Sequence, residues 1–392
     1  MKSLSTYHDI TTEIIKMDKQ SFVPMSPEIV QTTSFYYDTY EDFLEITDDE
    51  KNSFVYTRGS NPTTKELENM LAKLENGEKA KVFGSGMGAI SATLLTILKH
   101  GDHVLMLNTV YGTALSLGKY LDKFGVEVTN VYVDKASDIS QHVRANTRAI
   151  YFESPSSQHF TLLDLEEIGR IAKENDAYSI IDGTWASPLF QKPLDHSIDL
   201  VVHSLTKYVG GHSDLLGGVV IGKEELVDDI FEHGHQLLGS VISPLNSWLA
   251  IRGLRTLPVR MEYHSNSVKK FIDAIKDDER IHQIYHPYAG DDYQQSLAKK
   301  YLTGYGSLLS LEFVDEDFDK IKEFVNMLDY FSIGVSWGGF ESLVLPSFKG
   351  NNIEKLNYRG FKKSHIRLYI GLEDPDTLIK DFKDAMDKVY GK

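Results

Sequence analysis

Short β-rich runs alternate with helical segments between residues 81 and 221 of this 392-residue chain. No other feature of the sequence constrains the fold as strongly. Strand–helix–strand repeats of this kind build a mostly parallel sheet that is covered by helices on both faces. The β-rich runs are 81–83, 103–107, 126–133, 148–152, 178–181, 199–202 and 218–221. The pattern therefore predicts an α/β fold in which ligands bind at the carboxyl ends of the strands.

The segments on either side differ in character. Residues 1–60 are polar and aromatic without a sustained period, which predicts an extended arm. A helix is expected from Asn61-Pro62-Thr63, because Thr63 and Glu66 have capping-box spacing. A long helical stretch from 248 to about 276, strands at 308–313, 333–335, 342–345 and 365–370, and a last helix begun by Asp374-Pro375 indicate a smaller α+β domain. We predict an arm (1–60), an α/β domain (61–245) and a C-terminal α+β domain (246–392).

Composition excludes several classes of function. The chain has 41 basic and 57 acidic residues and a formal charge of −16, which argues against nucleic acid or an anionic membrane as a partner. An anionic ligand would need a local positive pocket. The absence of cysteine excludes disulfides, thiolate zinc sites and cysteine nucleophiles. The apolar stretch 89–98 is too short to span a bilayer, and the N-terminus lacks a signal peptide, so we expect a cytoplasmic protein.

Histidines at two places resemble metal ligands. They lie in Glu232-His233-Gly234-His235 and at His100 and His103, but neither group suggests a third ligand. We expect surface histidine pairs and no metal site.

The segment Gly84-Ser85-Gly86-Met87-Gly88 follows a β-rich run and precedes a helix that is expected from Ala89. Small residues let a backbone approach an anion, and the free N–H groups of a helix N-terminus point at it. The spacing matches neither the dinucleotide fingerprint nor a Walker A loop. The segment is either an anion site or a tight turn without a ligand.

Two residues with reactive side chains follow strands. Asp182 ends the run 178–181, where a buried carboxylate needs a cationic partner such as a protonated pyridine nitrogen; its alternative role is a helix cap. Lys207 lies just past the run 199–202, between hydroxyls and glycines. A desolvated lysine loses its proton readily and forms imines with carbonyls. Alone, Lys207 would be read as an exposed structural lysine; together with Asp182, an imine-forming lysine is favoured.

From Tyr56 to Asp374 the chain resembles the Cys/Met-metabolism pyridoxal-phosphate (PLP) enzymes of the cystathionine synthase and lyase group. The most specific segment is SLTKYVGGHSDLLGG, residues 204–218. The resemblance implies PLP-dependent transferase fold type I, with the cofactor bound by residues 61–245. It implies that Lys207 is the Schiff-base lysine and that Asp182 pairs with the pyridine nitrogen. The implied ligands of the cofactor phosphate are the amides of Gly86 and Met87 and the hydroxyls of Ser204 and Thr206.

The motif Tyr56-Thr57-Arg58-Gly59-Ser60-Asn61-Pro62-Thr63 is similar to the arm of this family. The resemblance implies that Tyr56 and Arg58 reach the cofactor phosphate of a neighbouring subunit, so that a dimer is the minimal unit and a homotetramer is expected. Alone, Arg58 would be read as a solvated surface residue. Tyr111 is similar to the aromatic residue that stacks on the pyridine ring, and it is expected to assist in deprotonating the incoming amine.

The C-terminal domain carries the implied substrate-binding residues. Arg367 lies within an apolar β-rich run, where it needs an anion. The resemblance makes that anion the substrate α-carboxylate, while an internal salt bridge is the alternative. Ser336 and Trp337 belong to the companion loop and are expected at the substrate, together with Tyr56.

Two positions depart from the family pattern. Ser157 stands where most members carry asparagine, at a position that contacts the phenolic oxygen of the cofactor. Gly183 stands in place of the asparagine of the usual Asp-Asn-Thr. Both leave the substrate and the efficiency open.

The expected reaction is β-elimination from cystathionine or a related thioether amino acid, which gives a thiol, pyruvate and ammonia. Lys207 would remove the α-proton. Trp337, Ser157, Trp185 and the segment 370–374 resemble bacterial cystathionine β-lyases, and Thr113 replaces a cysteine usual in methionine γ-lyases. The alternatives are γ-elimination or γ-replacement (cystathionine γ-lyase or γ-synthase, methionine γ-lyase, O-acetylhomoserine sulfhydrylase) and a cofactor-bearing regulator.

Overall fold

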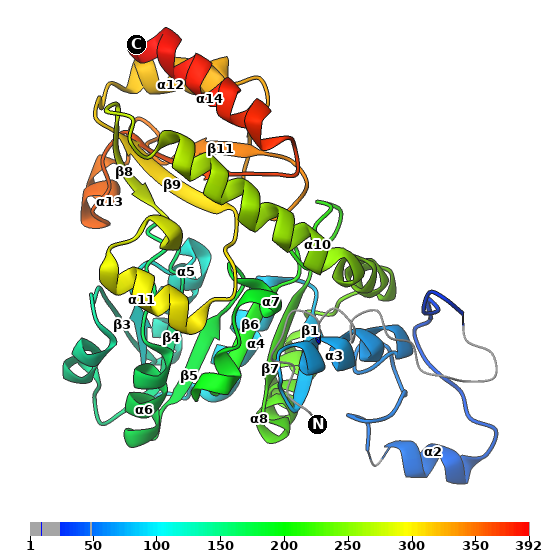
Figure 1. Ribbon diagram of the computed structural model, residues 1–392. Helices are drawn as coiled ribbons and strands as arrows, with labels where there is room; N and C mark the ends of the chain where they lie inside the picture. The colour runs from blue at the N-terminus through cyan, green and yellow to red at the C-terminus, as the bar shows by residue number, and fades with distance from the viewer. Residues whose placement is uncertain (1–8, 10–23, 48, 392) are drawn as a thin grey trace.

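The computed structural model describes residues 9, 24–47 and 49–391 and contains two sheets (Figure 1). The larger sheet has seven strands in the order β1-β7-β6-β5-β4-β2-β3. Strands β3, β2, β4, β5 and β6 run parallel to one another. Strand β7 is antiparallel to both β6 and β1. The strand bounds are β1 Lys79–Phe83, β2 His103–Leu107, β3 Glu127–Val131, β4 Thr147–Glu153, β5 Tyr178–Asp182, β6 Leu200–Ser204 and β7 Gly218–Gly222. The predicted mostly parallel α/β fold is confirmed.

Helices cover both faces of the larger sheet. Successive apolar residues along each strand point to opposite faces, and each face forms a core with its own helices. Ala149 and Tyr151 of β4 pack with α4 and α5 on one face, and Ile150 and Phe152 pack with α6 on the other. The helices of this part are α3 Pro62–Leu74, α4 Gly86–Ile97, α5 Gly112–Leu121, α6 Leu165–Glu174, α7 Ser187–Phe190, α8 Glu224–Asp229 and α9 Gln236–Leu238. Strands that are apolar on both sides lie in the interior of the molecule, and only their ends are available for chemistry.

The smaller sheet has five strands in the order β10-β11-β12-β9-β8. Its bounds are β8 Ile281–Tyr285, β9 Leu308–Phe313, β10 Ser332–Ile333, β11 Leu343–Pro346 and β12 His365–Tyr369. The accompanying helices are α10 Pro244–Ile275, α11 Asp292–Tyr301, α12 Phe318–Met327, α13 Ile353–Tyr358 and α14 Pro375–Tyr390. Strand β8 and helices α11 to α13 were not predicted from the sequence.

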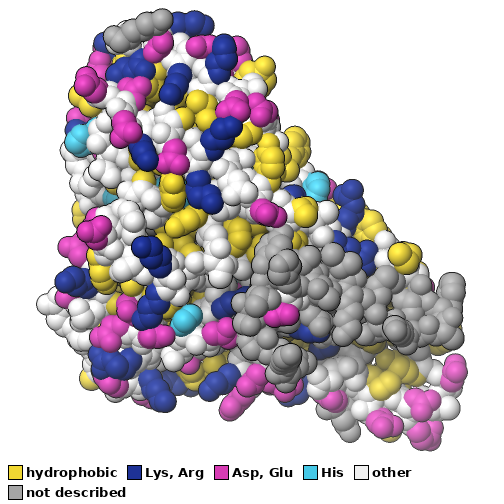
Figure 2. Space-filling view, in the orientation of Figure 1, with side chains coloured by type: hydrophobic (Ala, Val, Ile, Leu, Met, Phe, Trp, Pro, Cys, Tyr) yellow, Lys and Arg dark blue, Asp and Glu magenta, His cyan; other side chains and the backbone are white. Residues whose placement is uncertain are grey.

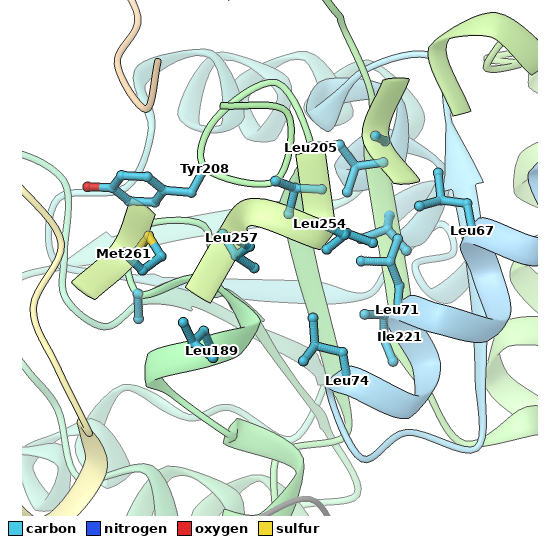
Figure 3. Packing of buried hydrophobic residues seen from close by; sticks show 14 of the residues in the cluster. Leu67, Leu71, Leu74, Leu189, Leu205, Tyr208, Ile221, Leu254, Leu257 and Met261 are labelled. Atoms are coloured by element: carbon cyan, nitrogen blue, oxygen red, sulfur yellow. The ribbon is translucent and has the colours of Figure 1, made fainter. Parts of the chain in front are cut away.

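Helix α10 joins the two sheets (Figure 1). In its first half, Leu254 and Leu257 share a core with Leu71 of α3, as Figure 3 shows. In its second half, Val268 and Phe271 pack into the core of the smaller sheet. A continuous helix therefore crosses the predicted boundary at residue 245, and the division into domains 61–245 and 246–392 stays a prediction.

The arm extends away from both sheets (Figure 1). It contains helix α2, Tyr40–Thr47, which the sequence did not predict. Residues 1–8 and 10–23 of the predicted arm lie outside the described residues. Helix α3 begins with Asn61 as its cap, whose side chain accepts a hydrogen bond from the Thr63 amide at 3.0 Å. The expected Thr63 capping box is wrong because Pro62 already occupies the first turn, where it needs no N–H partner.

The face drawn in Figure 2 intersperses basic and acidic side chains rather than separating them. Over the described residues, none of the helices combines the length and apolar character needed to cross a bilayer.

Candidate active site

Three strands of the larger sheet end in polar side chains at the same edge. They are Glu153 of β4, Asp182 of β5 and Ser204 of β6. Helix α4 begins beside them, because Phe83 at the end of β1 pairs with Gly218 of β7, and Gly218 pairs with Ser204. The antiparallel strand β7 thus brings the start of α4 beside the end of β6, although the two segments lie more than a hundred residues apart in the sequence.

The N-terminus of α4 lies against Ser204. A Cβ atom added to Gly86 would come within 3.0 Å of the Ser204 Cβ atom, so a larger residue would crowd Ser204. The Ser85 side chain caps the helix by accepting from the Gly88 amide at 3.0 Å. The amides of Gly86 and Met87 belong to the first turn, which has no intrahelical acceptors. This cradle of amides and a hydroxyl has the chemistry of a phosphate site. The Thr206 hydroxyl bonds to the Gly217 backbone, at 3.2 Å to its amide and 3.4 Å to its carbonyl.

The Asp182 carboxylate is held through one of its two oxygens. Both the amide and the hydroxyl of Thr184 donate to Oδ1, and the Thr184 hydroxyl accepts from the Ser204 amide at 2.8 Å. Among the described residues, Oδ2 has no hydrogen-bond partner. Burial raises the pKa of Asp182, against the Thr184 hydrogen bonds and the nearby positive charges of His203 and Lys207. A carboxylate held in this way fits a protonated ring nitrogen as its missing partner.

Lys207 is half-buried just beyond the end of β6, and it faces the loop 336–339 of the smaller sheet. Burial, and then the Arg367 charge, lower the pKa of Lys207 to about 8. Its Nζ atom donates to the Ser336 hydroxyl and lies 5.6 Å from the centre of the Trp337 ring. A Cβ atom on Gly338, which has a φ of +90°, would come within 2.7 Å of the Lys207 Cα atom. The loop therefore packs directly on the lysine backbone.

Arg367 reaches the same loop from β12. Its Nη2 atom donates to the Ser336 carbonyl at 3.1 Å, and burial lowers the pKa of its guanidinium. The internal salt bridge considered from the sequence is absent among the described residues. A half-buried arginine without an acidic partner fits an external anion.

Tyr111 precedes α5 with its side chain 51% exposed, and its amide donates to Glu153 Oε1. The Ser157 hydroxyl donates to Glu153 Oε2 at 2.5 Å. Glu153 was not predicted as part of the site. The signal was present, because Glu153 ends an apolar strand just as Asp182 does.

The arm residues are not brought to this edge within one chain. Tyr56 is 44% exposed, and the Arg58 guanidinium lies 5.4 Å from the centre of its ring. Arg58 Nε donates to Gln236 Oε1 at 3.3 Å. In the described chain, no hydrogen bond or ion pair joins either residue to Gly86 or Ser204.

Trp185 is a buried core residue whose ring nitrogen donates to the Leu308 carbonyl at 3.0 Å. The expectation that both histidine pairs lie at the surface is wrong for one member of each pair. His103 and His235 are buried rather than on the surface, and His103 lies between the hydroxyls of Thr147 and Thr129 at 2.8 and 2.9 Å. For His103 a signal of burial was present, because it begins the apolar β-rich run 103–107. The part of the chain that the structure describes holds no group of three His, Asp or Glu residues suited to a metal.

Comparisons with known proteins agree with this chemistry. The Cys/Met metabolism PLP-dependent enzyme family matches residues 11–387. An L-methionine γ-lyase from Fusobacterium nucleatum subsp. nucleatum is 35% identical over 95% of both chains. A cystathionine β-lyase from Lactococcus lactis subsp. cremoris is 36% identical over 86% of this chain and 89% of the relative. The crystal structure of a cystathionine γ-synthase from Xanthomonas oryzae pv. oryzae in complex with cystathionine has a TM-score of 0.90 at 27% identity, with 99% of each chain covered.

The family match spans nearly all of the chain, and the two relatives are about 35% identical to it over most of its length. The chain therefore belongs to the Cys/Met metabolism PLP-dependent enzyme family.

Proposed function

We propose that the protein is a PLP-dependent carbon–sulfur lyase that performs β-elimination on cystathionine or a related thioether amino acid. The products are a thiol, pyruvate and ammonia. One observation carries the proposal: Lys207 and Arg367 converge on Ser336, one on its hydroxyl and the other on its carbonyl. A carboxylate bound at Arg367 would bring the α-carbon of an amino acid close to the lysine amine.

The residues at the strand edge fit the cofactor of the family. When bound, PLP supplies an electron sink for the carbanion that develops at the α-carbon. We infer that Lys207 holds it covalently and that Asp182 pairs with its ring nitrogen through Oδ2. The phosphate ligands we propose are the amides of Gly86 and Met87 and the hydroxyls of Ser204 and Thr206. Support comes from the free carboxylate oxygen and from the glycine-dependent approach of α4 to Ser204.

Lys207 is suited to the proton transfers of the reaction. With its pKa lowered to about 8, an appreciable fraction of the amine is neutral near neutral pH and can accept the α-proton at Nζ. The loop at Trp337 and Gly338 packs over the lysine and limits the access of water. We propose that Tyr111 removes a proton from the incoming substrate amine.

Arg367 and Ser336 are the proposed binding site for the α-carboxylate. The guanidinium offers a planar pair of donors to a carboxylate, and only Nη2 is engaged with the Ser336 carbonyl. Trp337 and the Tyr56 side chain of a neighbouring subunit would contact the rest of the substrate. Since no hydrogen bond or ion pair joins the arm residues to Gly86 or Ser204 within the described chain, we propose a dimer as the minimal active unit and a homotetramer as the assembly. A cytoplasmic location also stays a prediction.

The second candidate is γ-elimination or γ-replacement. It is favoured by the methionine γ-lyase relative, whose identity to this chain is similar to that of the cystathionine β-lyase. γ-Chemistry requires a second proton removal, from the β-carbon, for which the sequence offers no evident base. The β-preference therefore depends on the reading of Trp337, Ser157 and Thr113.

Product analysis separates the candidates. Purified holoenzyme is assayed with cystathionine, methionine and O-acetylhomoserine, with Lys207→Ala as the inactive control. Pyruvate from cystathionine supports β-elimination, whereas 2-oxobutyrate as the main product overturns it in favour of γ-chemistry. Negligible turnover of all three substrates at full cofactor loading would indicate that the protein is a cofactor-bearing regulator instead of an enzyme.

A further inference from the structure

Glu153 and Asp182 form a pair of carboxyl groups at the edge of the larger sheet. They are register partners in the parallel strands β4 and β5, and both are the last residue of their strand. Neighbouring strands lie about 4.8 Å apart. Both side chains point to the same face as Tyr151, whose hydroxyl is buried and has no partner among the described residues.

The two carboxyl groups differ in their surroundings. Glu153 is 7% exposed and receives two neutral donors, the Tyr111 amide and the Ser157 hydroxyl. No cation contacts it in the described part of the chain. Asp182 is half-buried, keeps one oxygen free, and lies close enough to Lys207 and His203 for their charges to favour its ionised form.

Two like charges at this separation cannot both persist in a desolvated site. The proton should reside on the carboxyl group that has no cation, which is Glu153. Burial first, and then the Asp182 charge, raise the pKa of Glu153 to about 8, against the hydrogen bonds from Ser157 and from the Tyr111 amide, which favour the ionised form. The other titratable groups facing this pair are the Tyr151 hydroxyl on β4 and Tyr111, whose amide bonds to Glu153.

We propose that Glu153 is a neutral carboxylic acid that positions Tyr111 and Ser157 at the cofactor site and leaves Asp182 as the ionised member of the pair. Glu153 is thus a positioning residue. The inference rests on the proposed function, because the role of Asp182 as the partner of the ring nitrogen is part of it.

The proposal also explains why a serine is suited to position 157. In the structure the Ser157 hydroxyl donates to Oε2 at 2.5 Å. A hydroxyl can also accept, so when Glu153 is protonated the Ser157 hydroxyl can turn to accept from Oε2 and keep its own proton. That proton then remains available on the side of the cofactor. An asparagine would need its amide oxygen to accept from Glu153, which fixes the amide in one orientation.

The test compares Glu153→Gln with Glu153→Ala in the holoenzyme. Glutamine imitates a protonated carboxyl group, whereas alanine removes the acceptor of the Tyr111 amide. Two measurements are made: cofactor affinity, and the visible absorbance of bound cofactor between pH 6 and 10. Wild type should show a spectral transition near pH 8 that Glu153→Gln removes. Affinity should fall less than about threefold in Glu153→Gln and about tenfold or more in Glu153→Ala.

Infrared difference spectra supply a readout independent of turnover. Wild type at pH 7 should show a protonated-carboxyl band that is absent in Glu153→Gln and present in Ser157→Ala. The proposal is overturned if the band is missing in wild type, or if Glu153→Gln loses the cofactor as severely as Glu153→Ala. An unchanged transition near pH 8 in Glu153→Gln would assign it to Lys207 and also reject the proposal. The outcome does not depend on whether the substrate products are those of β- or γ-elimination.

Discussion

The residues at the strand edge and the residues of the arm differ in burial and in how they are held in place. At the strand edge, Asp182 and Lys207 are half-buried and held by hydrogen bonds from the same chain. On the arm, Tyr56 and Arg58 are exposed, and within the described residues the Arg58 side chain has one hydrogen bond, to Gln236. A sheet holds its strand ends in place without a partner, whereas an arm acquires its geometry from what it lies against. Under the proposed function, one chain would organise the covalent chemistry, and a neighbouring chain would complete the binding of the phosphate.

Lys207→Ala should have the largest effect, because it removes the amine that we propose binds the cofactor and accepts the α-proton. We expect at least a roughly thousandfold loss of kcat/KM and loss of the visible absorbance of bound cofactor. Borohydride reduction followed by mass spectrometry locates the attached lysine. The exposed Lys223→Ala serves as the control and should behave as wild type. Reductive trapping at another lysine would remove Lys207 from the centre of the site.

Arg367→Ala tests whether the residues that meet at Ser336 within one chain also bind the substrate. A charged hydrogen bond to a carboxylate at a desolvated site contributes about 2–5 kcal/mol, so kcat/KM should fall by roughly 30- to 5,000-fold. The loss should appear mainly in KM, with the cofactor absorbance retained. Arg367→Lys should recover part of it, because it keeps the charge without the planar fork. The exposed Arg252→Ala is the control, and an unchanged KM in Arg367→Ala would contradict the carboxylate role.

Arg58→Ala tests the arm half. Loss of a charged hydrogen bond to phosphate should weaken cofactor affinity by about tenfold or more. The shared site predicts complementation. Mixed with Lys207→Ala chains, Arg58→Ala chains should form hybrids with one intact site, which restores up to about a quarter of wild-type activity. Absence of complementation in verified hybrids would show that Arg58 serves its own chain.

The sequence predicts the strand-edge half better than the arm half for a physical reason. Periodicity places Asp182 and Lys207 at strand ends, and parallel strands end at a common edge. Glu153 escaped notice because its importance depends on the register that sets it opposite Asp182. The burial of His103 depends on neighbouring strands in the same way. Helix α2 has eight residues and buries none of them, so its short apolar pattern was not distinguished from the aromatic residues of the surrounding arm.

The pKa of Lys207 tests whether a single chain is enough to prepare the strand-edge lysine for its reaction. Because burial and Arg367 lower its pKa to about 8, uptake of PLP by the apoenzyme should speed up with rising pH and level off near pH 8. An ordinary lysine would continue to gain toward 10.5. Arg367→Met should move the plateau to higher pH, since it removes a nearby positive charge that disfavours the protonated amine. Stopped-flow absorbance measures both rates, and a plateau near 10.5 in wild type would rule out a desolvated amine.

Gln236→Ala should have the smallest effect. It tests whether Arg58 is oriented by Gln236 of its own chain or by the cofactor phosphate of a neighbouring chain. The hydrogen bond from Arg58 Nε to Gln236 Oε1 measures 3.3 Å and lies at the surface, where such bonds contribute little. If a neighbouring phosphate orients Arg58, its loss should reduce cofactor affinity by only about twofold. Isothermal titration of apoenzyme with PLP measures the change, with Arg58→Ala as the reference. A loss as large as in Arg58→Ala would mean that α9 of the same chain holds the guanidinium, and the contrast between a self-organised strand edge and a partner-dependent arm would fail.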